Sequence, residues 1–200
     1  MSLLRRLLGL KPRDLATPPR GAGDRLPGGQ RFTKGDLLTF EMVVTADGMV
    51  SRFVDNYAVG QASEEQKQAY DVLVEAFNAC VELCRPGVNT DVLERAAEQA
   101  IRRRGLAEYG FWNHAEPLVW WGMAAQTWQG VPLCSSIALP GEIVVSIEPS
   151  ICRSGLGARL LRMDQQTVRD DVFKVGRMVI VTQTGCTLPV GSPPATLQTM

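Results

Sequence analysis

Apolar residues, interrupted by one or two polar ones at a time, fill the first patterned part of the chain, residues 37–59, as is typical of β-strands. Two strand-like runs, LLTFEMVV and MVSRFVDNYAV, flank the sequence TADG, in which Asp47-Gly48 is a typical turn pair. With these two residues at the tip, Val43 faces Arg52 and Glu41 faces Val54. Glu41 and Arg52 are then diagonal neighbours on one face of the hairpin, a separation that long side chains bridge. The pattern predicts a β-hairpin in which Arg52 has a carboxylate partner.

Two amphipathic helices are predicted after the hairpin. Ser63-Glu64-Glu65-Gln66 is a capping box, and an apolar stripe with helical spacing follows it as far as Cys84, where Arg85-Pro86-Gly87 ends the helix. A second helix is predicted near Thr90 to Arg104, with Gly105 as its stop. The residues expected on the buried faces are Ala69, Val72, Leu73, Ala76, Phe77, Cys80, Val81 and Cys84 in the first helix, and Val92, Leu93, Ala96, Ala97, Ala100 and Ile101 in the second.

Strand-like sequence returns in the last third of the chain. The turn LPGE leads into IVVSIEPSI, a strand that Pro149 should interrupt, and VFKVGRMVIVTQTG is the last regular segment. Strands and helices together predict an α/β (α+β) fold, and no internal repeat is visible. We expect one domain over residues 35–190, preceded by a basic arm rich in Pro and Gly (residues 1–34) and followed by a flexible tail (residues 191–200).

The composition fits one globular domain with an uneven distribution of charge. Of its 200 residues, 45% are hydrophobic, and the formal net charge is zero. Residues 1–34 hold eight Lys and Arg against two Asp, a charge of +6, so the rest of the chain carries −6. Such an arm can fold back on the acidic body, meet an acidic partner or stay solvated.

Several classes of function are not expected. The sequence has no apolar run of the ~20 residues that a membrane helix needs, and no secretory cleavage site. The arginines of residues 153–169 lack the aromatic residues of a single-strand nucleic-acid binder and the pattern of a DNA-reading helix. The five cysteines form no CxxC pair, and Cys80 and Cys84 lie on the apolar stripe as core thiols. We expect a cytoplasmic, reduced protein that binds neither a membrane nor nucleic acid.

The order and spacing of several segments resemble one protein family. They are similar to the M24 family of methionine aminopeptidases, Xaa-Pro peptidases and creatinase. The segments that carry the resemblance are KGDLLTFEMV, the hairpin strand that runs into VGQASEEQ, the RPG after the first helix, LPGEIVVSIEPSI and MVIVTQTG. The resemblance covers residues 33–190. It implies part of a pita-bread fold, in which a curved antiparallel sheet is backed by helices. The half-repeat that opens the family's fold has no counterpart here, which implies a homo-oligomer or a partner chain that completes the fold.

The family's two metal ions are held by two Asp, one His and two Glu, and the resemblance carries these positions onto Glu41, Arg52, Trp121, Glu148 and Gly176. Only Glu41 and Glu148 can bind a metal, because a guanidinium stays protonated, an indole only donates and glycine has no side chain. The family's substrate-facing His falls on Trp128. The single histidine, His114, lies seven residues before Trp121.

We therefore expect neither metal nor cofactor. Arg52 is expected to occupy the space of the family's metal ions and to pair with Glu41 and with Glu148. The alternative is that Arg52 is only a structural ion-pair residue. The tryptophan-rich segment, with Trp121, Trp128 and His114, would line a ligand pocket or fill the core.

Two functions stay open. The first is a degenerate M24 domain that binds a small molecule or a protein. The second is a metal-independent enzyme for a small amide or amino-acid-like compound, with Glu41 or Glu148 as the base and Arg52 as an anion clamp. A working metalloaminopeptidase is the least favoured function.

Overall fold

The computed structural model describes residues 32–46, 49–106, 118–121, 138–153, 155–162, 167–170 and 172–200. Residues 1–31 of the expected arm therefore lie outside the described residues. The two helices are α2 (Glu64–Leu83) and α3 (Thr90–Arg103). The strands are β1 (Leu37–Ala46), β2 (Met49–Ala58), β3 (Leu118–Trp121), β4 (Ile143–Ile147), β5 (Ser150–Cys152), β6 (Ala158–Arg162), β7 (Thr167–Asp170), β8 (Val172–Lys174), β9 (Arg177–Val181), β10 (Cys186–Thr187) and β11 (Gln198–Thr199).

The hairpin of β1 and β2 has the predicted register. Val43 lies opposite Arg52, Glu41 opposite Val54 and Ala46 opposite Met49. The strands alternate strictly, so Leu37 and Glu41 point to one face and Leu38 and Phe40 to the other. Register in a hairpin is set by its turn, which explains why the sequence was sufficient here.

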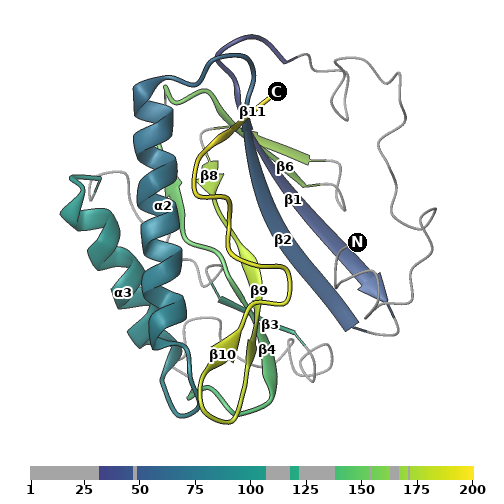
Figure 1. Cartoon of the computed structure of the whole chain (residues 1–200). Coiled ribbons are helices and arrows are strands. Elements are labelled where there is room, and N and C mark those ends of the chain that lie inside the picture. Colours follow the sequence, from purple (N-terminus) through teal and green to yellow (C-terminus); the bar gives the residue numbers. More distant parts are fainter. Residues whose placement is uncertain are drawn as a thin grey trace.

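The described strands form three sheets with the orders β11-β2-β1-β6-β7, β10-β9-β4-β3 and β5-β8. Most neighbours are antiparallel, whereas β1–β6 and β11–β2 are parallel pairs. In Figure 1 the long hairpin lies on one side of the molecule, and α2 and α3 lie side by side on the other, next to β4, β9 and β10. The mixed α/β class and the sheet backed by helices are as the sequence predicted.

Two stretches of the chain pass from the sheet of β4 and β9 to the sheet of β5 and β8, and they do so at neighbouring positions. β4 pairs with β9, and beyond Pro149 the chain continues as β5, which pairs with β8. Pro149 has no N–H for the ladder, but its carbonyl oxygen accepts a hydrogen bond from the Val175 amide at 3.2 Å. The expected last segment is likewise divided into β8 and β9 at Val175-Gly176. These two breaks place Glu148 and Gly176 at the point where the sheets meet.

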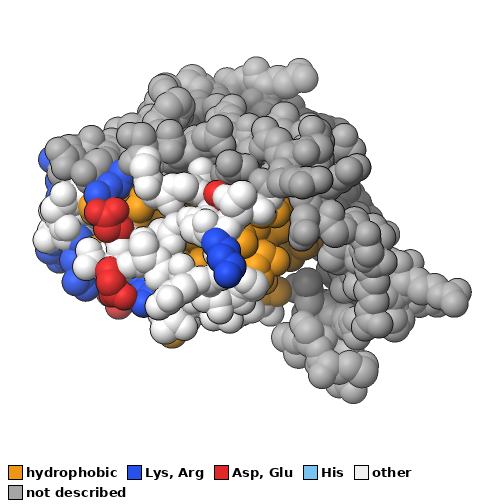
Figure 2. Space-filling view, turned by 90° about the horizontal axis from the view of Figure 1, so that it is seen from above, with side chains coloured by type: hydrophobic (Ala, Val, Ile, Leu, Met, Phe, Trp, Pro, Cys, Tyr) orange, Lys and Arg blue, Asp and Glu red, His pale blue; other side chains and the backbone are white. Residues whose placement is uncertain are grey.

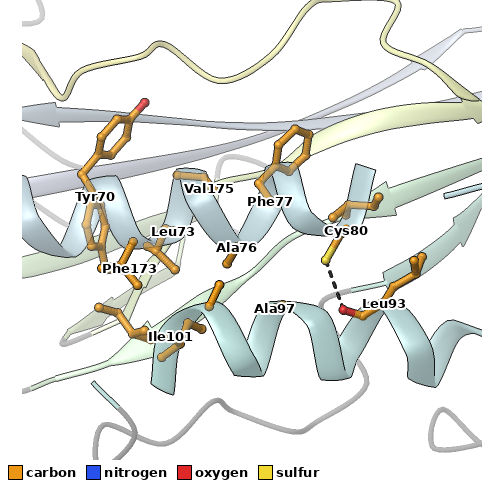
Figure 3. Packing of buried hydrophobic residues seen from close by; sticks show 14 of the residues in the cluster. Tyr70, Leu73, Ala76, Phe77, Cys80, Leu93, Ala97, Ile101, Phe173 and Val175 are labelled. Carbon is orange, nitrogen blue, oxygen red and sulfur yellow. Dashed lines mark hydrogen bonds between the residues drawn. The ribbon is translucent and has the colours of Figure 1, made fainter. Parts of the chain in front are cut away.

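The main hydrophobic core lies between the helices and the sheets (Figure 3). The capping box of Ser63 and Gln66 begins α2 as predicted. Along α2 the stripe buries Leu73, Phe77 and Cys80, and the Cys80 thiol donates to the Leu93 carbonyl of α3 at 3.2 Å. The expected buried faces agree with the structure except at three half-buried positions: Val81, Val92 and Ala96.

The end of the chain is tied to the domain. The sequence predicts a flexible tail over residues 191–200, whereas Gln198–Thr199 forms β11 beside Tyr57 and Ala58 of β2. The Tyr70 hydroxyl also donates to the Pro194 carbonyl at 2.8 Å. These contacts join residues that are far apart in sequence, so no local sequence pattern predicts them.

A smaller apolar cluster lies on the opposite face of the hairpin from the main core. It consists of Leu38 with Phe32, Phe40, Tyr57 and Val59, and the Phe40 and Tyr57 rings meet edge to face with centroids 5.9 Å apart. Figure 2 looks onto the end of the molecule where β11 lies and shows described hydrophobic side chains among charged ones of both signs. No helix in the described ranges is long and apolar enough to cross a membrane.

Burial of two core groups predicts a loss of stability at alkaline pH. Burial raises the pKa of Tyr70 from 10.0 to about 12 and the pKa of the Cys80 thiol from 9.0 to about 12. Their protonated forms therefore favour the folded state fully below about pH 9, and this contribution is lost as the pH rises toward 12. We expect the melting temperature to fall over this range and to fall less in Tyr70→Phe. An equal fall in the two proteins, measured by circular dichroism, would exclude the role of Tyr70.

Candidate functional site

The candidate site is a buried cluster of charged side chains beneath the hairpin. Glu41 lies on the inward face of β1 and is 1% exposed. Glu148, also 1% exposed, follows β4 at the break before Pro149, and its Oε1 accepts a hydrogen bond from the Ser146 hydroxyl at 2.5 Å. The structure thus brings together two carboxylates that are 107 positions apart in the sequence, from Glu41 to Glu148.

Lys174, the last residue of β8, joins the two carboxylates. Its Nζ lies 2.6 Å from Glu41 Oε2 and 2.9 Å from Glu148 Oε2. Burial alone would lower the pKa of Lys174, but the opposite charges of Glu148 and Glu41 and the hydrogen bonds to them outweigh it, so the pKa is raised. Lys174 therefore stays an ammonium ion at neutral pH. We name Glu41, Lys174 and Glu148 the ion cluster.

Gly176 faces the ion cluster across a space too small for a side chain. Its backbone forms a bridge with Val54, whose amide donates to the Gly176 carbonyl at 3.1 Å. A Cβ at this position would lie 2.7 Å from Cγ of Glu148 and 3.0 Å from Cγ2 of Val54. Both neighbours are buried, so neither can move aside without disturbing the packing around it.

Gly176→Ala is therefore expected to destabilise the fold. Overpacking of a filled interior costs about 1–3 kcal/mol. Gly185→Ala is the matched control, since a Cβ at Gly185 meets nothing within 4 Å. Urea unfolding of the two variants measures the difference. Equal stability of Gly176→Ala and Gly185→Ala would mean that the space beside Glu148 is open.

Arg177, the first residue of β9, holds the hairpin against the second sheet. Its Nη1 donates to the carbonyl oxygens of Val54 at 2.6 Å and Gly176 at 2.8 Å, and its Nη2 lies 2.6 Å from Asp55 Oδ1. The guanidinium is nearly buried, and three acceptors share it. These contacts fix the position of β9 and, through Gly176, the wall of the ion cluster.

The other residues singled out by the sequence are placed only in part. Arg52 lies opposite Val43 in the hairpin, and its side chain lies outside the described residues. Trp121 is the last residue of β3, again with an undescribed side chain, and Trp128 and His114 lie outside the described residues altogether. Lys174 lies between Glu41 and Glu148, and the expected pairing of Arg52 with these carboxylates stays a prediction.

The sequence reasoning missed Lys174 and Arg177. The sequence does contain a signal for them, because VFKVGRMVIV has one cation on each side of Gly176 in a segment that is otherwise apolar. A buried cation in such a strand requires acidic or carbonyl partners. Which residues act as these partners could not be predicted, because Glu41, Val54 and Asp55 lie more than 100 positions before Lys174 and Arg177 in the sequence.

Comparisons with known proteins agree with this fold. A dipeptidase, PepE, from Mycobacterium ulcerans superposes with a TM-score of 0.67 at 24% identity, covering 86% of this chain and 42% of that one. For an X-Pro aminopeptidase from Thermotoga maritima the TM-score is 0.68 at 18% identity, with 86% and 43% covered. In sequence, the Xaa-Pro dipeptidase of Pyrococcus furiosus is 25% identical over 128 residues, which are 64% of this chain and 36% of the relative. The chain spans less than half the length of these proteins.

The fold and these likenesses define the class: a mixed α/β domain that corresponds to part of the pita-bread fold. The chain belongs to metallopeptidase family M24, whose model matches residues 17–183. Among the residues that the structure describes, no group of three or more His, Cys, Asp or Glu side chains is arranged to hold a metal ion.

Proposed function

We propose that this M24 domain works without the metal pair of its family, as a binding protein for a small molecule or a protein partner. The ion cluster is the observation that carries the proposal. Lys174 bonds both Glu41 and Glu148, the two positions of the family's ligand set that can still bind a metal. An ammonium ion between two carboxylates supplies the positive charge that a metal would otherwise supply.

The donor set does not fit two divalent ions. Each carboxylate already accepts from Lys174, whose raised pKa keeps it a cation that repels a second one. At Gly176 no side chain can be added without a clash with Glu148. Arg52, at the position of the family's second Asp, cannot ligate a metal whatever its orientation, since its guanidinium stays protonated.

The same contacts argue against the alternative of a metal-independent enzyme with Glu41 or Glu148 as its base. Both carboxylates are fully buried and lie against Lys174, so neither is placed to meet a substrate proton. We therefore assign the two glutamates to the ion pairs that hold Lys174 in the interior.

A hydrolysis assay tests the proposed loss of peptidase chemistry. The full chain is incubated with the dipeptide Ala-Pro, with Mn²⁺ or with a chelator, and free proline is measured. We expect no proline above the protein-free blank in either condition. Hydrolysis that depends on Mn²⁺ and disappears with the chelator would overturn the proposal.

Self-association is the second part of the proposal. The resemblance to the M24 family leads us to expect a homo-oligomer or a partner chain. Light scattering of the purified chain should give a molar mass of at least two times 21.9 kDa. A single mass of 21.9 kDa at all concentrations would contradict the homo-oligomer.

A further inference from the structure

Two cysteines from distant parts of the chain approach the same carbonyl oxygen at the end of α2. Cys84 is the C-cap residue of that helix, and Cys186 begins β10. Both belong to the main hydrophobic core, Cys84 as a buried member and Cys186 as a partly buried residue packed against it. The Cys186 thiol donates to the Val81 carbonyl at 3.5 Å, and the Cys84 amide donates to the same oxygen at 3.1 Å. Figure 1 shows β10 beside this end of α2.

We propose that Cys84 and Cys186 are a modification site, at which a peroxide oxidises the pair to an intrachain disulfide. The Cys186 sulfur, as thiolate, attacks one peroxide oxygen; the O–O bond breaks, a sulfenic acid forms and the peroxide is reduced to water. The Cys84 sulfur then attacks the Cys186 sulfur. An S–S bond forms, the S–O bond breaks, and the hydroxyl leaves as water with the Cys84 proton.

Burial decides the order of the two steps. Cys186 is partly exposed, so it is the thiol that a dissolved oxidant reaches, whereas Cys84 is 2% exposed and serves as the resolving thiol. Burial raises the pKa of Cys186 and raises that of Cys84 to about 12. The thiolate is therefore scarce at neutral pH, and oxidation should be slow there and faster at higher pH.

Cys80 provides an internal control within the same core. It lies one helical turn before Cys84 and is 3% exposed, but its thiol donates to the Leu93 carbonyl of α3. Cys80 is thus bonded to the neighbouring helix, while Cys84 and Cys186 both bond to the Val81 carbonyl. We assign the disulfide to Cys84–Cys186 and not to Cys80.

The disulfide would connect α2 to the hairpin of β9 and β10. Cys186 lies opposite Val181 at the end of β9, the strand that begins with Arg177. A bond across 102 positions of sequence, from Cys84 to Cys186, restricts the unfolded chain strongly. The oxidised protein should therefore melt at a higher temperature than the reduced protein, and a thiol reductant should reverse the change.

The test is mapping of disulfides after oxidation of the full chain with hydrogen peroxide. Free thiols are alkylated, the protein is digested without reductant, and mass spectrometry identifies linked peptides. We expect a Cys84–Cys186 linkage in the wild type and in Cys80→Ser, faster at pH 9 than at pH 7, and a higher melting temperature. In Cys186→Ser and Cys84→Ser both the linkage and the gain in melting temperature should be lost.

Two results would overturn the proposal. One is a Cys186 that is alkylated or oxidised to the sulfinic acid while no linked peptide forms. The other is a Cys80 linkage in place of the Cys84 linkage. Because the wild type and Cys80→Ser both carry the proposed pair, the test does not depend on the folding of variants that lack it. It is also independent of whether the ion cluster binds metal.

Discussion

Lys174→Ala is expected to be the most damaging single substitution in the described part of the chain. It leaves Glu41 and Glu148 buried together without the ammonium ion that lies 2.6 and 2.9 Å from them. Removing one partner from a buried ion pair costs about 3–5 kcal/mol. For a domain of this size that lowers the melting temperature by roughly 6–20 °C. Calorimetry of the full chain measures the shift.

Two further variants give this result its meaning. Lys67→Ala is the control for loss of a lysine, because Lys67 forms an exposed pair with Glu64 that contributes less than about 1 kcal/mol. A triple variant, Lys174→Met with Glu41→Gln and Glu148→Gln, removes all three charges and should recover part of the lost stability. If Lys174→Ala melted like the wild type, the ion cluster would not be the buried ion-paired unit described above.

Arg177→Ala is the second substitution with a large expected effect. It removes the donors to the carbonyl oxygens of Val54 and Gly176 and the partner of Asp55. Each charge-assisted bond of this kind contributes about 1.5–3 kcal/mol, so we expect a loss of about 3 kcal/mol or more. The free energy of unfolding in urea measures it.

Arg95→Ala is the matched control for Arg177→Ala. Arg95 forms an exposed pair with Asp91 four residues away in α3, a contact that contributes about 0.3–0.5 kcal/mol. A loss at Arg177 no larger than the loss at Arg95 would contradict the role of the guanidinium in joining β2 to β9. Arg177→Lys should retain only part of the stability, since an ammonium ion cannot reach three acceptors in the same fork geometry.

The parts of the fold that depend on neighbouring residues could be predicted from the sequence. The register of β1 and β2 follows from one turn, the start of α2 from Ser63 and Gln66, and the break of the strand after Ile147 from Pro149. In each case the chemistry that decides the structure lies within a few residues of the element. The tail differs, because β11 pairs with Tyr57 and Ala58 from the far end of the sequence.

The candidate site could be predicted only in part for the same reason. The sequence indicated Glu41 and Glu148 and the need for a cation between them. It suggested Arg52 because hairpin geometry makes Arg52 a neighbour of Glu41, a relation that can be worked out along one turn. Lys174 reaches Glu41 from β8, 133 positions further along the chain, and only the arrangement of the sheets brings it there.

Bound metal per chain is the most direct test of the proposal that Lys174 takes the place of the metal pair. The purified full chain is incubated with Mn²⁺, Co²⁺ or Zn²⁺, freed of excess ions and analysed by mass spectrometry for metal content. The ion cluster predicts a stoichiometry near zero for each metal, because the Lys174 ammonium ion already lies between Glu41 and Glu148 and pairs with both carboxylates. One or two ions held tightly per chain would contradict the proposed loss of the metal pair and would make a metallopeptidase the leading function.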